Sequence, residues 1–163
     1  MHFARQMYIL TFNLQVNLNF MKEIKHRSDC PISFSLDILG DKWTLLILRD
    51  MIFNDKTAYG EFLQSEEKIA TNILADRLSV LYCQGLIDKK VATDKKSKFL
   101  YSLTEKGIGL LPTIIELTIW GAQYNPSGGN EALLKALRKD KEGTIQKYRE
   151  TLKKRATDFI SQE

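Results

Sequence analysis

Residues 57–86 constrain the fold most, because they hold two helical patterns separated by a polar turn. The first pattern covers residues 58–64. In the second, Leu74, Leu78 and Leu81 follow the i, i+4, i+7 spacing of one apolar helix stripe. Small side chains occupy another face of this helix: Thr71, Asn72, Ala75, Asp76 and Ser79. The pattern is typical of a helix-turn-helix that lays its second helix in a DNA major groove, although any small helical domain can show it.

Composition places the chain among ordinary globular proteins. Its 163 residues, 44% of them hydrophobic and 27% charged, suffice for one domain with appendages. The net charge of +4 is a mild preference for anionic partners. Cys30 and Cys83 lie far apart, which excludes a disulfide framework or a four-cysteine zinc site and fits a reducing cytosol. No apolar run is long enough to cross a membrane, so we expect a soluble, cytoplasmic protein without a membrane partner.

The sequence offers no set of residues suited to catalysis. Its histidines are His2 and His26, both before the organised part of the chain. Metal-protease, phosphate-loop and G-x-S-x-G motifs are missing, and acidic residues occur singly. We therefore expect no enzyme activity, no cofactor and no metal site.

Residues 1–28 differ in composition from the rest and are interpreted as an N-terminal extension. Polar and apolar side chains alternate strictly over residues 13–20, as in a half-buried strand. Two interpretations stay open. Residues 1–20 are either an additional strand or arm, or upstream sequence included by an early start, with translation beginning at Met21.

The domain over residues 29–125 is predicted to be mainly helical. Pro31 suits the first turn of a helix that ends at Gly40. Asp41 can cap a second helix, which is apolar on almost every side and is expected to form the centre of the core.

A hairpin is predicted after the two-helix unit, with strands at residues 87–93 and 99–103. Its tip carries Lys95, Lys96 and Lys98. Lysines are common at solvated hairpin tips, but three helices followed by a basic hairpin favour a winged helix.

Residues 104–124 predict a helix that Pro112 kinks or restarts. Beyond the proline this helix has more apolar side chains than a small domain can bury, so we expect a subunit interface. Packing on the chain's own core is the alternative for about half of them. The interface candidates are Ile114, Ile115, Leu117, Ile119 and Trp120.

Residues 126–163 follow as a charged helical tail, interrupted at Gly143, that pairs with a partner or docks weakly.

Asn72 is the best candidate for a base contact, because an amide can form two hydrogen bonds to adenine. Thr71 is placed to touch a phosphate or a thymine methyl group, and Ser79 to reach the DNA backbone. Asp76 repels phosphate unless it accepts from cytosine or pairs with Arg77, whose alternative role is structural.

Positive charge is scarce on this helix, so affinity must come from lysines elsewhere. Lys95, Lys96 and Lys98 are the main candidates, with Lys56 and Lys68 as further phosphate contacts.

Cys30 has two interpretations. It is either a small buried hydrophobe or a thiolate whose pKa is lowered at a helix N-terminus. Lys25, His26 and Arg27 would add to the second effect. Cys83, in the apolar part of its helix, is interpreted as a packing residue.

Several spaced motifs together resemble the HxlR-type winged-helix transcriptional regulators, over about residues 29–124. They are Cys30-Pro31, LDILGDKWTLLILR from Leu36, Tyr59-Gly60-Glu61-Phe62, LADRL from Leu74, Gly85-Leu86-Ile87, YSLTEKG from Tyr101, Leu111-Pro112 and Trp120-Gly121.

The resemblance implies a homodimer that binds an inverted repeat in double-stranded DNA, with one recognition helix in each half-site and the wing beside it. It also implies a dimer interface built from the N-terminal helix and the helix after the wing. Some members sense electrophiles or oxidants through a cysteine at the position of Cys30; the effector here stays unknown.

The chain departs from the family pattern at two positions. Where members often carry a capping serine this chain has Ala70, and if Thr71 takes over that cap it is lost as a base contact. Lys98 stands where arginine is common, which favours phosphate over minor-groove contacts.

We therefore predict a dimeric winged-helix DNA-binding regulator, a repressor rather than an activator, with thiol modification of Cys30 as a hypothesis. The alternative is a winged-helix module that docks proteins. Such a module would not need three lysines at the hairpin tip.

Overall fold

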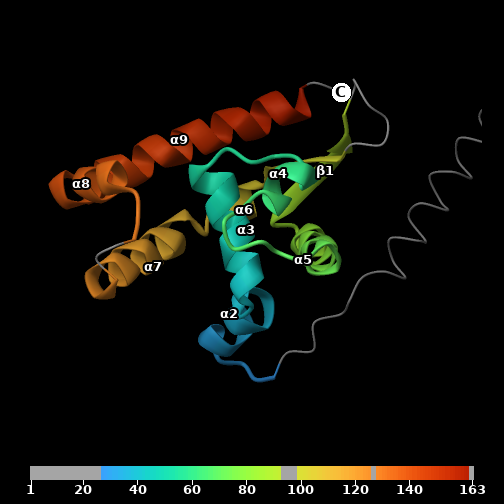
Figure 1. The fold of residues 1–163 in the computed structure, drawn as a ribbon, viewed down its shortest axis with the longest axis horizontal. Coiled ribbons are helices and arrows are strands. Elements are labelled where there is room, and N and C mark those ends of the chain that lie inside the picture. The colour runs from blue at the N-terminus through green and yellow to red at the C-terminus, as the bar shows by residue number, and fades with distance from the viewer. Residues whose placement is uncertain (1–26, 93–98, 126–127, 162–163) are drawn as a thin grey trace, which may run out of the picture.

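The computed structural model describes residues 27–92, 99–125 and 128–161, and it has the expected mainly helical architecture with one hairpin (Figure 1). Its elements are α2 (Pro31–Leu39), α3 (Lys42–Phe53), α4 (Tyr59–Leu63), α5 (Thr71–Cys83), β1 (Ile87–Val91), β2 (Phe99–Leu103), α6 (Glu105–Ile108), α7 (Leu111–Tyr124), α8 (Glu131–Lys139) and α9 (Lys141–Ile160).

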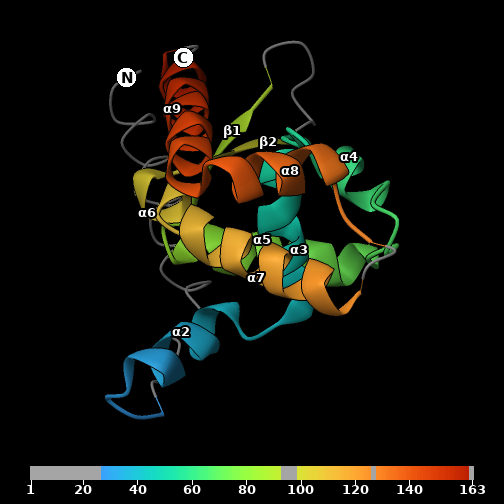
Figure 2. The same ribbon diagram turned by 90° about the vertical axis from the view of Figure 1, so that its left-hand side faces the viewer.

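Helix α3 lies at the centre of the molecule, between α5, α7 and α9 in both ribbon views (Figures 1 and 2). The carboxylate of Asp41 caps it by accepting from the backbone N–H of Trp43 at 2.9 Å and of Thr44 at 3.2 Å. Leu48 and Ile52 on this helix are completely buried or nearly so. The predicted cap and the predicted central helix are both confirmed.

The apolar stripe of α5 holds the second helix of the helix pair against the core. Leu74, Leu78 and Leu81 are all buried and belong to the hydrophobic core cluster. After the helix, Gly85 adopts a φ of +65°, a backbone conformation that favours glycine, and the chain enters β1 two residues later.

Strands β1 and β2 form an antiparallel pair in which Ile87 faces Leu103 and Val91 faces Phe99. The first strand ends at Val91, two residues earlier than the sequence predicted. An isolated bridge between Ala58 and Leu100 joins the hairpin to the start of α4. The tip with Lys95, Lys96 and Lys98 and the alternating stretch at residues 13–20 lie outside the described residues.

Pro112 restarts a helix rather than kinking one. The short α6 ends at Ile108, and α7 begins at Leu111 with the proline in its first turn, where the missing N–H leaves no helical bond unmade.

The C-terminal segment differs from the tail that the sequence suggested, one that pairs with a partner or docks weakly. Leu133 and Leu137 of α8 and Ile145 and Leu152 of α9 are buried in the same cluster as the winged helix. The break between the helices falls at Asp140, which ends α8 and caps α9, whereas Gly143 lies inside the first turn of α9.

Gly107 offers a sharp test of how tightly α6 packs on the hairpin. A Cβ at this position would lie 2.1 Å from the backbone oxygen of Leu86, whereas one at Gly60, in α4, would meet nothing within 4 Å. We expect Gly107→Ala to lower the free energy of unfolding by about 2 kcal/mol through overpacking. Gly60→Ala is the matched control and should be neutral or stabilising by up to about 1 kcal/mol. Urea unfolding followed by circular dichroism measures both, and equal midpoints for the two variants would contradict the packing described.

Candidate nucleic-acid interface

One face of α5 presents the small side chains expected for base reading. Asp76 is half-buried, and the other four members of the set are exposed: Thr71, Asn72, Ala75 and Ser79. The structure thus places all five predicted residues on the accessible side of a helix whose opposite side is buried.

The first turn of α5 has no side-chain cap. Ala70 occupies the N-cap position and Thr71 is the first helical residue, so Thr71 does not take over the cap. The backbone carbonyl of Thr71 accepts a hydrogen bond from the Tyr59 hydroxyl at 2.7 Å, which links α4 to the start of α5. The Thr71 side chain itself remains exposed.

Asp76 is partly neutralised by its neighbour on the helix. An Arg77 nitrogen (Nη2) lies 2.8 Å from Oδ2 of Asp76, and Nε of the same guanidinium lies 3.8 Å from Oδ1 of Asp41. Arg77 is therefore a structural partner of carboxylates, as the alternative interpretation had it. Through Asp41, the cap of α3, it also connects the recognition helix to the central helix.

Lys56 is not placed to contact a phosphate, and this prediction is corrected. Its ammonium group is 2.7 Å from Oδ2 of Asp50 and 2.7 Å from the hydroxyl of Ser65, and its side chain is largely buried. Lys68, the other predicted contact outside the hairpin, is exposed in the turn before α5.

Asp50 is a buried carboxylate in the last turn of α3, with 2% of its surface exposed. Besides the Lys56 ammonium it accepts from the hydroxyl of Ser65 at 2.5 Å, the guanidinium of Arg49 at 2.7 Å and the amide of Asn54 at 3.0 Å. Burial by itself raises the pKa of this carboxyl, but the hydrogen bonds from Lys56, Ser65 and Arg49 outweigh it and hold the pKa below its ordinary value. The group is therefore a compensated buried anion.

The Asp50 network fixes the turn of the helix-turn-helix. Ser65 lies in that turn, and Glu67, also in the turn, receives two hydrogen bonds from Arg49, at 2.5 and 3.0 Å. The Arg49 guanidinium lowers the pKa of Glu67, so this partner is also an anion at neutral pH. Two residues of α3 thereby hold the segment that sets the angle between α4 and α5.

Cys30 lies where the thiolate interpretation requires it. It is the N-cap residue of α2, it is exposed, and the backbone N–H groups of Ser33 and Ile32 lower the pKa of its thiol. Arg27 was expected to assist, but its guanidinium pairs with Asp37 at 2.6 Å.

The predicted interface residues of α7 divide into two groups. Ile114 and Ile115 are buried in the chain's own core, which removes them as interface candidates, and Ile119 packs partly against that core. Leu117 and Trp120 remain exposed, Trp120 by 64%. Further large apolar side chains are exposed on α2 and at the end of α7: Ile32, Phe34, Leu36 and Tyr124.

Among the described residues, no group of histidine, cysteine and acidic side chains is arranged to hold a metal ion. No helix in that part of the chain is long and apolar enough to span a membrane.

A helix pair with a polar second helix, followed by an antiparallel hairpin, defines the winged helix-turn-helix class. Comparisons with known proteins agree. The HxlR-like helix-turn-helix family matches residues 38–128, and the chain belongs to this family of DNA-binding transcriptional regulators.

Several relatives are similar over the same region. YdeP of Bacillus subtilis (strain 168), described as an uncharacterized HTH-type transcriptional regulator, is 36% identical over 95 residues, which are 58% of this chain and 73% of YdeP. The redox regulator HypR in its reduced form superposes with a TM-score of 0.53 and 30% identity, covering 59% of this chain and 94% of HypR. Its oxidized form gives a TM-score of 0.52 at 30% identity, over 62% of this chain and 99% of HypR.

Replacing Asp50 should destabilise the fold strongly. We expect Asp50→Asn to lower the free energy of unfolding by about 3 kcal/mol, since removing one partner of a buried charge network leaves the others uncompensated. Because the folded pKa of Asp50 is lowered, its contribution is present above the unfolded pKa of ~3.9 and is lost as the pH falls through the lower folded value. The difference between wild type and variant should therefore shrink in acid.

Urea unfolding at neutral pH and at pH values below ~4 measures both effects. Asp158→Asn removes the same charge from an exposed site on α9 and is the matched control, with an expected change within about 0.5 kcal/mol. A loss for Asp50→Asn no larger than that of the control would show that the network does not hold the fold.

Proposed function

We propose that the protein is a homodimeric transcriptional repressor that binds an inverted repeat, with α5 in the major groove of each half-site. The observation that carries this proposal is the set of small uncharged side chains exposed on the first half of α5 (Thr71, Asn72 and Ala75), which follows a turn held by the Asp50 network and lies beside an antiparallel hairpin. In the cytoplasm, such a dimer would bind across a promoter and block its transcription.

Base reading is assigned to Asn72, with Thr71 as a contact to phosphate or to a thymine methyl group and Ser79 as a contact to the DNA backbone. Ala75 offers only a methyl group, and Asp76 is suited to accept from cytosine N4 where Arg77 permits it. Lys68 and the hairpin-tip lysines are proposed to supply the phosphate contacts that the helix lacks: Lys95, Lys96 and Lys98.

The subunit interface is proposed to combine α2 with the exposed side of α7. Six large apolar side chains on these two helices face solvent in the single chain: Ile32, Phe34, Leu36, Leu117, Trp120 and Tyr124. Covering them with a second copy removes an apolar surface of a kind that single chains rarely expose. Two-fold symmetry of the protein would then match the symmetry of the DNA site.

Asn72→Ala tests sequence reading directly. We expect it to weaken binding to the DNA upstream of the protein's own gene by a factor corresponding to about 1–3 kcal/mol, because a bidentate base contact is lost. Binding to unrelated DNA should change little, since phosphate contacts dominate it. Gel-shift titrations across a salt series measure both, and Gln146→Ala, an exposed amide on α9, is the matched control.

The alternative function, a protein-docking winged helix, gives a different outcome. Such a module would bind the upstream DNA no more tightly than unrelated DNA, and Asn72→Ala would leave the affinity for both unchanged. That result would refute the proposed function.

Cys30 is proposed to make DNA binding sensitive to thiol modification. Its lowered pKa predicts that iodoacetamide at neutral pH labels Cys30 before Cys83, which is half-buried. Peptide mass spectrometry follows the labelling, and gel shifts before and after it measure the change in DNA affinity. A Cys30→Ser protein that responds to the reagent as the wild type does would rule out this sensor.

A further inference from the structure

Helices α8 and α9 lie beyond the residues that match the family model. The family match ends at residue 128, and the reduced HypR structure is covered to 94% by a part amounting to 59% of this chain. Yet α9 runs along the hairpin, and its C-terminal end lies beside β1 (Figure 1).

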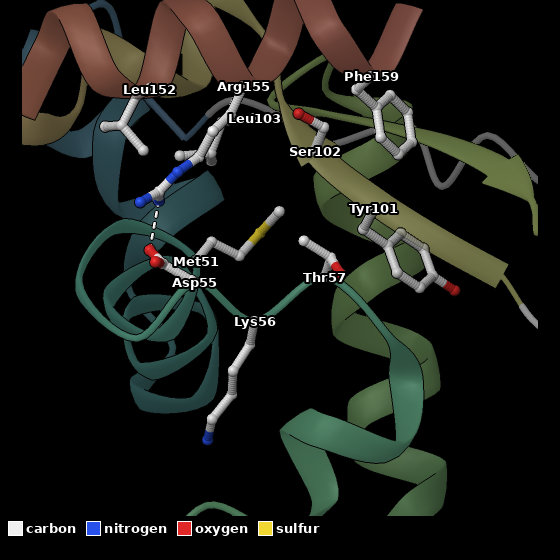
Figure 3. Close-up of a pocket in the computed structure, with 10 residues that line it drawn as sticks. All are labelled: Met51, Asp55, Lys56, Thr57, Tyr101, Ser102, Leu103, Leu152, Arg155 and Phe159. Atoms are coloured by element: carbon white, nitrogen blue, oxygen red, sulfur yellow. Dashed lines mark ion pairs between the residues drawn. The ribbon is translucent and has the colours of Figure 1, made fainter. Parts of the chain in front are cut away.

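The middle of α9 is anchored firmly in the core. Leu152 is 4% exposed, and the ring of Tyr148 meets the ring of Phe53 edge-on, with centroids 5.4 Å apart. An ion pair between Arg155 and Asp55 adds a tie to the end of α3 (Figure 3). The helix therefore has a fixed position relative to α3, and so relative to α4 and α5, the helix pair proposed to read DNA.

The last turn of α9 holds the outer part of β1. The ammonium group of Lys90 donates to the backbone carbonyl of Phe159 at 2.5 Å and lies 4.2 Å from the centre of the Phe159 ring. That carbonyl is among the last four of the helix, which have no partner within it, and the negative end of the helix dipole attracts a cation. Lys90 thus caps α9 with its charge while the aromatic ring packs over its ammonium group.

A cavity of about 100 Å³ lies between α9, β2 and the end of α3, and Phe159 lines it together with apolar side chains such as Met51, Leu103 and Leu152 (Figure 3). Beyond Lys90 the facing pair Val91 and Phe99 is exposed, and although Ala92 is buried, none of these three residues belongs to the hydrophobic cluster. The Lys90–Phe159 contact therefore lies where the strands leave that cluster.

We propose that α9 is a brace that sets the position of the wing, and that Lys90 and Phe159 are positioning residues for DNA binding. The proposal rests on the proposed function for its DNA readout but not for its structural one. Phe159 carries no charge, so any effect of its removal on DNA affinity acts through the wing and not through a lost phosphate contact.

The test compares Phe159→Ala with Ile160→Ala, the next residue on the same helix turn, whose side chain is 60% exposed. Hydrogen exchange of the free, full-length protein should show faster exchange of the β1 and β2 amides in Phe159→Ala, with α3 and α5 unchanged. Gel shifts on the DNA site should show about fivefold weaker binding, the factor that roughly 1 kcal/mol represents. Ile160→Ala should match the wild type in both measurements.

The outcomes separate the two proposals. If the wild type binds no DNA selectively, the proposed function fails, and hydrogen exchange still decides whether the brace exists. Unchanged exchange in β1 and β2 of Phe159→Ala would overturn the brace. Faster exchange throughout the chain with a lowered melting temperature would also overturn it, because the effect would then be general and not local to the wing. Local loosening of the hairpin without any loss of affinity would refute the positioning role in DNA binding.

Discussion

The arrangement of the helix-turn-helix, α4 and α5 with the turn between them, depends on one buried carboxylate. Asp50 is removed from water on the central helix, and an isolated charge there would be costly. Lys56, Ser65 and Arg49 compensate it, and two of these partners lie outside α3, in the segments before and after α4. The compensation can be complete only in one arrangement of the helix-turn-helix. Because the buried anion must keep these partners, the segments on both sides of α4 are constrained, and with them the angle at which α5 follows.

Ion pairs within the fold also engage cations near the proposed DNA-facing side of α5. Lys56 is used internally, and Arg77 is occupied by Asp76 and Asp41. Two cations near the recognition helix are thus committed to structure, which leaves α5 to contribute shape and hydrogen bonding. We propose that affinity then comes from the hairpin and from Lys68, in which case the position of the wing matters more here than in a protein with a basic recognition helix. A helix that braces β1 fits this need.

The sequence predicted features governed by local rules. The Asp41 cap, the apolar stripe of α5 and the restart at Pro112 each depend on residues within one or two turns, so spacing alone reveals them. It could not predict contacts that only folding creates. The sequence predicts Lys56 as a phosphate contact because its partner Asp50 lies in a largely apolar helix. That isolated acid, next to Arg49, was the one available signal of a buried network.

Burial of the later helices was also beyond the sequence. Ile114 and Leu117 look alike in an apolar helix, and only the position of α3 and α9 decides that the first is buried and the second exposed. The buried positions of α8 and α9 are widely spaced among charges, which resembles a solvated helix until the surface that receives them is known.

Whether the chain reads DNA as a symmetric winged-helix dimer is tested most directly by selecting bound sequences from a random double-stranded library with the full-length protein. The expected result is an enriched inverted repeat whose half-site centres are separated by one helical turn, about 10 base pairs, or a multiple of it, bound by two chains. Recovery of no enriched sequence, or of a single unrepeated site bound by one chain, would contradict it.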